Sequence, residues 1–148
     1  MPQALDLEKG VQETARLISR IPARPILVAV YGHNGAGKSY IIAKLADVLK
    51  EQGFEPSRSG TAPDRSTFEG IRDYPGFYRN RVSFFHCAWP RPAADSDLFA
   101  DEDPNILAPA VLGRQVDVNI AIYSPKICSV PSGGYDIIIA NPDSRRAW

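Results

Sequence analysis

The chain has 148 residues, its 17 basic and 17 acidic side chains cancel, and 44% of its residues are hydrophobic. This length predicts a single domain over residues 1–148 with a substantial core. The charge balance argues against nucleic acid or an anionic membrane surface as a partner. No apolar run reaches the roughly 18 residues of a membrane span, and the first residues lack the pattern of a secretion signal. We therefore expect a cytoplasmic protein.

Residues 1–24 are predicted to form an N-terminal helix and its exit. Apolar residues recur at steps of three and four over residues 4–21, and prolines then end the helix. We expect this helix to pack on the edge of a sheet, with a partner-binding helix as the alternative. Gly10 is expected to weaken its first turn.

The next segment carries the strongest signal in the chain. An apolar run over residues 26–31 predicts a central parallel strand, because such strands are covered on both faces. Residues 32–39 match G-x-x-x-x-G-K-[ST], the pattern of a phosphate-binding loop. An amphipathic pattern over residues 38–52 predicts a helix that Gly53 ends. Strand, loop and helix therefore follow in the order that this motif needs.

The residue types of this loop suit a polyphosphate. Glycines permit positive φ and close backbone approach, so that successive N–H groups converge on an anion in front of the helix N-terminus. We expect Lys38 to neutralise γ-phosphate charge during catalysis and Ser39 to bind Mg²⁺. The predicted contacts with the cofactor, ATP or GTP with Mg²⁺, are Gly32, His33, Asn34, Gly35, Ala36, Gly37, Lys38, Ser39 and Tyr40.

The rest of the chain predicts further strands joined by long connections. Residues 54–81 and 88–105 are expected to be variable loops or a lid, with little regular structure. Because residues 124–134 are a short connection, we expect the last two strands to pair antiparallel. The pattern predicts an α/β fold, a P-loop NTPase-like three-layer sandwich with a mostly parallel central sheet. The remaining elements are expected at residues 82–87, 116–123 and 135–140 as strands and 106–112 as a short helix.

Other chemically capable side chains have ordinary explanations. Residues 95–103 carry five acids, which predict a solvated loop, with a metal- or partner-binding loop as the alternative. His86 is expected to be a hydrogen-bonded structural histidine, and His33 to face solvent; a catalytic role and a phosphate contact, respectively, are the alternatives. Cys87 and Cys128 have no metal-ligand spacing and predict buried free thiols.

The chain resembles the P-loop nucleoside and small-molecule kinases, among them the uridine kinase-like group. The similarity covers about residues 4–70 and includes the loop, then Gly60-Thr-Ala-Pro63 and Ser66-Thr-Phe-Glu69. The ending Asn141-Pro-Asp143 is similar to the close of the last strand in such kinases. The resemblance implies ATP–Mg²⁺ binding and transfer of the γ-phosphoryl group to a hydroxyl of a small-molecule acceptor.

Two acids of that group are displaced here. Such kinases place an aspartate after the second strand as the base for the acceptor hydroxyl, where this chain has Phe54-Glu-Pro-Ser57. Asp64 is the nearest acid and our candidate base. Such kinases also hold Mg²⁺ through a carboxylate after a strand beside the loop, and Asp143 is our candidate for that role. The chain is short for a complete member of the group, which fits a truncated or degenerate relative.

Two other functions stay open. Asp73-Tyr-Pro-Gly76 fits the D-x-x-G turn of G-domain GTPases, with Thr61 or Thr67 as the switch threonine, but the Asn-Lys-x-Asp motif that reads guanine is absent from the sequence. The displaced acids also suit a nucleotide-dependent interaction module without catalysis. An oligomer is compatible with each of these functions.

Overall fold

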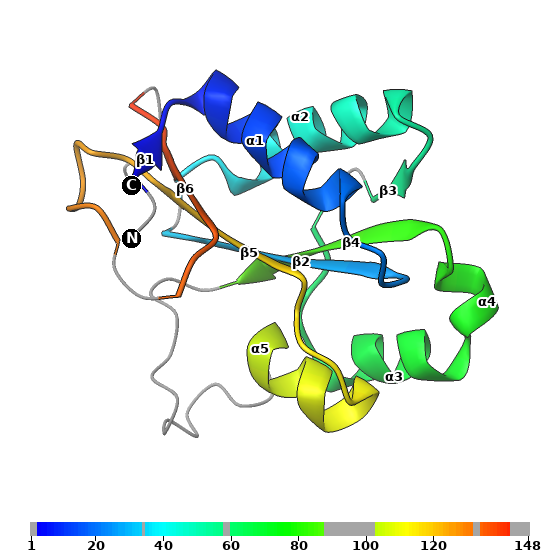
Figure 1. Ribbon diagram of the computed structural model, residues 1–148. Coiled ribbons are helices and arrows are strands. Elements are labelled where there is room, and N and C mark those ends of the chain that lie inside the picture. The colour runs from blue at the N-terminus through cyan, green and yellow to red at the C-terminus, as the bar shows by residue number, and fades with distance from the viewer. Residues whose placement is uncertain (1–2, 34, 58–59, 88–102, 132–133, 143–148) are drawn as a thin grey trace.

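The computed structural model describes residues 3–33, 35–57, 60–87, 103–131 and 134–142. These residues form three layers, with a parallel sheet between two layers of helices (Figure 1). The predicted α/β class, with helices on both faces of a central sheet, is confirmed.

The described residues form one sheet of six strands, in the order β1-β6-β5-β2-β4-β3. Every pairing is parallel. The prediction that the last two strands pair antiparallel is wrong, because residues 124–136 return the chain to the other end of the sheet, and about a dozen residues suffice for such a crossover. The strands are β1 (Ala4–Leu5), β2 (Ile26–Gly32), β3 (Glu55–Pro56), β4 (Arg81–Cys87), β5 (Val118–Tyr123) and β6 (Ile137–Ala140).

Helices cover both faces of the sheet (Figure 1). The core on one face is built with α1 and α2, and the core on the other with α3, α5 and the π-helical turn η1. Residues 54–81, where we expected little regular structure, instead hold β3, α3 and α4. The helices are α1 (Leu7–Ser19), α2 (Lys38–Glu51), α3 (Arg65–Asp73), α4 (Pro75–Tyr78) and α5 (Pro104–Leu107), followed by η1 (Ala108–Leu112).

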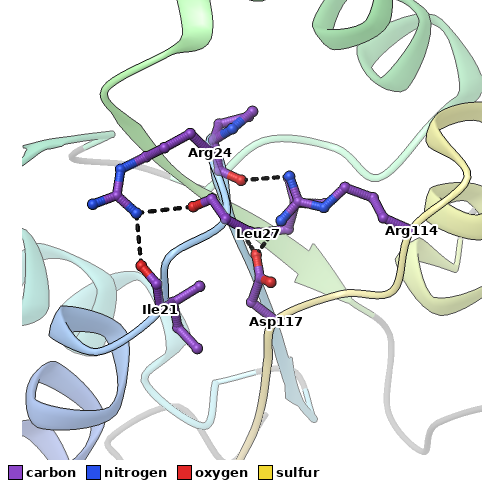
Figure 2. Close-up of polar contacts among 7 residues, drawn as sticks. Ile21, Arg24, Leu27, Arg114 and Asp117 are labelled. Carbon is purple, nitrogen blue, oxygen red and sulfur yellow. Dashed lines mark hydrogen bonds and ion pairs between the residues drawn. The ribbon is translucent and has the colours of Figure 1, made fainter.

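Strand β2 lies inside the sheet and is buried along its whole length, as its apolar sequence predicts. Its amino end is fixed by a polar cluster that Figure 2 shows. The Leu27 N–H donates to Asp117 Oδ2 at 2.8 Å, and the Arg114 guanidinium pairs with the same oxygen at 2.5 Å and donates to the Pro25 carbonyl at 2.8 Å. Because Asp117 directly precedes β5, these contacts fix β5 against β2 at the end remote from the 32–39 loop.

Gly10 is a contact point between α1 and β6. It is buried, and a Cβ on it would lie 2.5 Å from Cγ1 and 2.8 Å from Cδ1 of Ile139. Besides its expected weakening of the first helical turn, this glycine therefore has a packing role. Its missing side chain lets α1 approach the sheet closely.

We predict that Gly10→Ala lowers the free energy of unfolding by about 1–3 kcal/mol, because the added methyl group overpacks the contact with Ile139. The higher helix propensity of alanine alone would raise the free energy of unfolding by about 1 kcal/mol. The sign of the measured change therefore separates overpacking from helix propensity. Urea unfolding measures it. Gly76→Ala in α4 is the matched control, since a Cβ there meets nothing within 4 Å. A more stable Gly10→Ala protein would contradict the close approach.

Candidate functional site

The 32–39 loop joins β2 to α2 at the carboxyl end of the central strand. Gly35 and Gly37 have φ values of +80° and +101°, in the left-handed region that favours glycine. The Ala36 N–H donates to the His33 carbonyl at 3.1 Å and closes a tight turn. The loop is thus bent back on itself as the motif predicts, although Asn34 lies outside the described residues.

The loop lies at the end of a strand whose next helix and that of the adjacent strand lie on opposite faces of the sheet. After β2 the chain enters α2 on one face of the sheet, and after β4, the neighbour of β2, it reaches α5 on the other face (Figure 1). In open α/β sheets, ligands bind outside the carboxyl ends of the strands at such a switch point. The predicted binding loop and the favoured binding position therefore coincide.

Lys38 spans the carboxyl ends of β2 and β4. Its Nζ donates to the Gly32 carbonyl at 2.8 Å, and a longer bond of 3.4 Å reaches the Cys87 carbonyl. Partial burial lowers the pKa of Lys38 below its ordinary value. A Cβ on Gly32 would lie 3.0 Å from Cγ of Lys38 and 2.9 Å from the Ile122 carbonyl oxygen. Glycine at 32 thus makes room for the lysine stem above the strand.

Helix α2 begins without a capping side chain. Helices α1, α3 and α5 each begin after an aspartate, Asp6, Asp64 or Asp103, whose carboxylate accepts a backbone N–H of the first turn. Helix α2 begins after Gly37 and has no acid in its first turn. Within the described part of the chain, no side chain therefore caps its N-terminal amides, and no acid in its first turn offsets its partial positive charge. Ser39 and Tyr40 in this turn are exposed.

Two side chains tie the 32–39 loop to the neighbouring strands. The Ser124 N–H, just after β5, donates to His33 Nε2 at 3.0 Å. Asn141, just after β6, donates from Nδ2 to the Ala36 carbonyl at 2.9 Å. The expectation that His33 faces solvent is therefore wrong, since its ring is partly buried and serves the fold. Asn141 was not among the predicted site residues. Its position directly after the closing strand was the feature of the sequence that could have identified it.

His86 lies in β4 beside the site. Its Nε2 atom is buried and has no hydrogen-bond partner among the described residues, so the hydrogen bond expected of a structural histidine is not found at this atom. Gly60 packs against the ring so closely that a Cβ there would lie 2.0 Å from His86 Cδ2. Thr61 continues this segment along β4, with its N–H on the Phe84 carbonyl at 2.9 Å. Burial and, secondarily, the charge of Lys38 lower the pKa of His86.

Asp64 is the N-cap of α3. Its Oδ1 accepts the Thr67 N–H at 2.9 Å and the Ser66 hydroxyl at 2.9 Å. These hydrogen bonds, the backbone bond first, lower the pKa of Asp64. The carboxylate is exposed, and no hydrogen bond or ion pair within the described part of the chain joins it to the 32–39 loop. Asp143, the candidate metal residue, lies outside the described residues.

Other candidate residues have structural partners. Asp103, the one acid of the 95–103 run in the described part, is buried and accepts the Tyr31 hydroxyl at 2.8 Å. Cys87 and Cys128 are free, as predicted, although only Cys87 is fully buried. Asp73 of the D-x-x-G turn ends α3 and pairs with its neighbour Arg72 at 2.8 Å. It follows a helix, whereas the GTPase alternative places it after a strand.

No group of three or more His, Cys, Asp or Glu side chains within the described ranges could hold a metal ion. Mg²⁺ with a nucleotide does not require such a group, since it takes its ligands largely from phosphates, water and one or two side chains. The exposed Ser39 hydroxyl at the start of α2 fits that donor set. The accompanying carboxylate stays a prediction at Asp143.

We predict that the free protein loses stability as the pH falls below about 6.5, the ordinary pKa of histidine. The pKa of His86 is lowered in the folded state, so its neutral form stabilises the fold above 6.5, and this contribution is lost as the pH falls through the folded value. Melting temperatures at about pH 7.5 and pH 5 measure the loss. His86→Gln should lose less over this range, and an equal loss in both proteins would contradict the assignment.

Comparisons of this chain with models of protein families, with curated proteins and with solved structures give no significant match. Among the described residues, no helix combines the length and the apolar character needed to cross a membrane. The function therefore has to be inferred from the geometry of the site.

Proposed function

We propose that this chain is a P-loop protein that binds a nucleoside triphosphate with Mg²⁺ and transfers the γ-phosphoryl group to a hydroxyl of a small acceptor. The observation that supports this most directly is the uncapped N-terminus of α2. A loop with two left-handed glycines leads into it, at the switch point of a parallel sheet, with the Lys38 ammonium beside it. The helix dipole, free amides and a fixed cation all favour an anion at this point.

Each part of the site has a distinct role in this proposal. The backbone N–H groups of Gly37 and of the first turn of α2 cradle the phosphates. Lys38 exchanges its two carbonyl acceptors for phosphate oxygens and neutralises γ-phosphate charge. Ser39 holds the magnesium ion, which neutralises and orients the phosphates when bound. Most of the rate enhancement in phosphoryl transfer comes from such positioning and charge stabilisation.

The transfer itself needs a proton acceptor. The acceptor oxygen forms a bond to the γ-phosphorus while the bond from that phosphorus to the β–γ bridging oxygen breaks and the diphosphate leaves. The hydroxyl proton passes to a base, and Asp64 is our candidate. Its hydrogen bonds, all to Oδ1, hold the Asp64 carboxylate ionised and make it a weak base. To pass its proton to Asp64, the hydroxyl of the small molecule therefore has to approach the other carboxylate oxygen, Oδ2.

We predict that Lys38→Ala abolishes the rise in melting temperature that Mg²⁺·ATP gives the wild type, because the fixed cation of the phosphate site is gone. Thermal melts with and without a saturating ligand measure this rise. Lys50→Ala is the matched control, since Lys50 is an exposed lysine in the last turn of the same helix. A full shift in Lys38→Ala would refute phosphate binding at this loop.

We predict that Asp64→Asn lowers kcat by about 10²–10⁴-fold with little change in melting temperature. Asparagine caps a helix about as well as aspartate but cannot take the proton. Asp64→Ala removes both the cap and the base, so it should also lower stability by about 1 kcal/mol. An unchanged kcat in Asp64→Asn, measured with ATP and an acceptor that the wild type uses, would remove Asp64 from the base role.

A nucleotide-dependent interaction module without turnover is the second candidate. One observation favours it. Cys87 is the last residue of β4, and Ser124 and Asn141 directly follow β5 and β6. None of these three residues at the carboxyl ends of the strands is a carboxylate. Lys38-dependent binding of Mg²⁺·ATP in a protein that transfers no phosphoryl group would select this candidate. Comparing melting shifts with ATP and GTP tests the GTPase alternative in the same experiment.

A further inference from the structure

Asn141 links the end of β6 to the 32–39 loop through hydrogen bonds. Its backbone N–H donates to the Tyr123 carbonyl at the end of β5 at 2.8 Å. Its side chain is buried, with 7% exposure, and donates from Nδ2 to the Ala36 carbonyl at 2.9 Å. The loop carbonyl is therefore anchored to two strands by one residue that lies 105 positions further along the chain.

This bond fixes the direction of a donor. The peptide between Ala36 and Gly37 is planar, and in a trans peptide the C=O and N–H groups point in opposite directions. Because Asn141 holds the Ala36 carbonyl on its own side, the Gly37 N–H points away from Asn141. That N–H makes no hydrogen bond to the described part of the chain. It is therefore aimed out of the loop in front of α2.

The fit between Asn141 and the loop also explains the glycine at 37. A Cβ on Gly37 would lie 2.5 Å from Asn141 Nδ2, in addition to the strain of its φ of +101°. The missing side chain thus permits both the turn and the approach of the amide. A carboxylate of the same shape could not replace the amide, because it has no proton to donate to a carbonyl.

We propose that Asn141 is a positioning residue of the phosphate site. Its amide turns the Ala36–Gly37 peptide so that the Gly37 N–H donates to a polyphosphate. The inference rests on the proposed phosphate binding, and it adds that the strand-ending residue of β6 sets the shape of the loop. Asn141 itself makes no contact with the ligand.

Isothermal titration with Mg²⁺·ATP and with inorganic pyrophosphate tests this role in Asn141→Ala and Asn141→Asp. Loss of one hydrogen bond to a charged group predicts a fall in affinity of about 10–100-fold for both probes. Asn119→Ala is the matched control. Asn119 is a partly buried strand asparagine whose amide oxygen accepts from Asn105 at 2.7 Å, and it has no hydrogen bond to the 32–39 loop among the described residues. It should lose stability and keep the wild-type affinity.

A second measurement does not need a ligand. In the free protein, hydrogen exchange and the NMR resonance of the Gly37 amide should change in both Asn141 variants and stay unchanged in Asn119→Ala, because only the former release the peptide. Asn141→Asp keeps the side-chain shape and covers the case in which Asn141→Ala fails to fold.

The outcomes separate the two proposals. If the wild type binds neither probe, the proposed function fails and this inference with it. If the wild type binds and Lys38→Ala does not, but the Asn141 variants bind as tightly as the wild type, only the role of Asn141 is refuted. Weaker binding in Asn119→Ala equal to that in Asn141→Ala would also refute it, because the effect would then reflect stability alone.

Discussion

The burial of β2 on both faces and along both edges constrains everything else in this structure. Its backbone is hydrogen-bonded to β4 on one side and β5 on the other, and all seven of its residues are buried. The polar cluster of Asp117 and Arg114 fixes its amino end. The carboxyl end of β2 therefore has a defined position, and this position fixes where the 32–39 loop begins. A loop that presents backbone groups to a phosphate, as we propose for this one, needs such a fixed base.

The distribution of carboxylates shows how a neutral chain could bind an anion at the proposed site. Asp6, Asp64 and Asp103 each satisfy the first-turn amides of a helix, so the positive ends of α1, α3 and α5 are neutralised within the fold. At α2 a glycine takes the corresponding place, and the Lys38 ammonium is held on the Gly32 carbonyl at the end of β2. The net charge of zero thus conceals a local field at the start of α2 that aspartates neutralise at the starts of α1, α3 and α5.

The sequence allowed β2, the 32–39 loop and α2 to be predicted because every signal lies within the segment that it describes. The partners of the loop could not be predicted in the same way. His33 and Ala36 meet residues that lie 91 and 105 positions away, and no local pattern encodes such pairs. The antiparallel expectation for β6 failed for a related reason, since connection length limits topology without fixing it. The cap role of Asp64 was visible locally, but its acidic side chain suggested catalysis first.

Among the described residues, both edges of the sheet are formed by strands of two residues. β1 pairs with the apolar β6 through Ala4 and Leu5, and β3, which contains Pro56, pairs with β4. A short strand is a poor template for another chain, and a proline has no N–H to donate to one. The long apolar strands in the middle are thereby kept from adding strands of a second molecule. This arrangement protects the protein from edge-to-edge aggregation, and loss of the few residues of β1 would expose β6 to it.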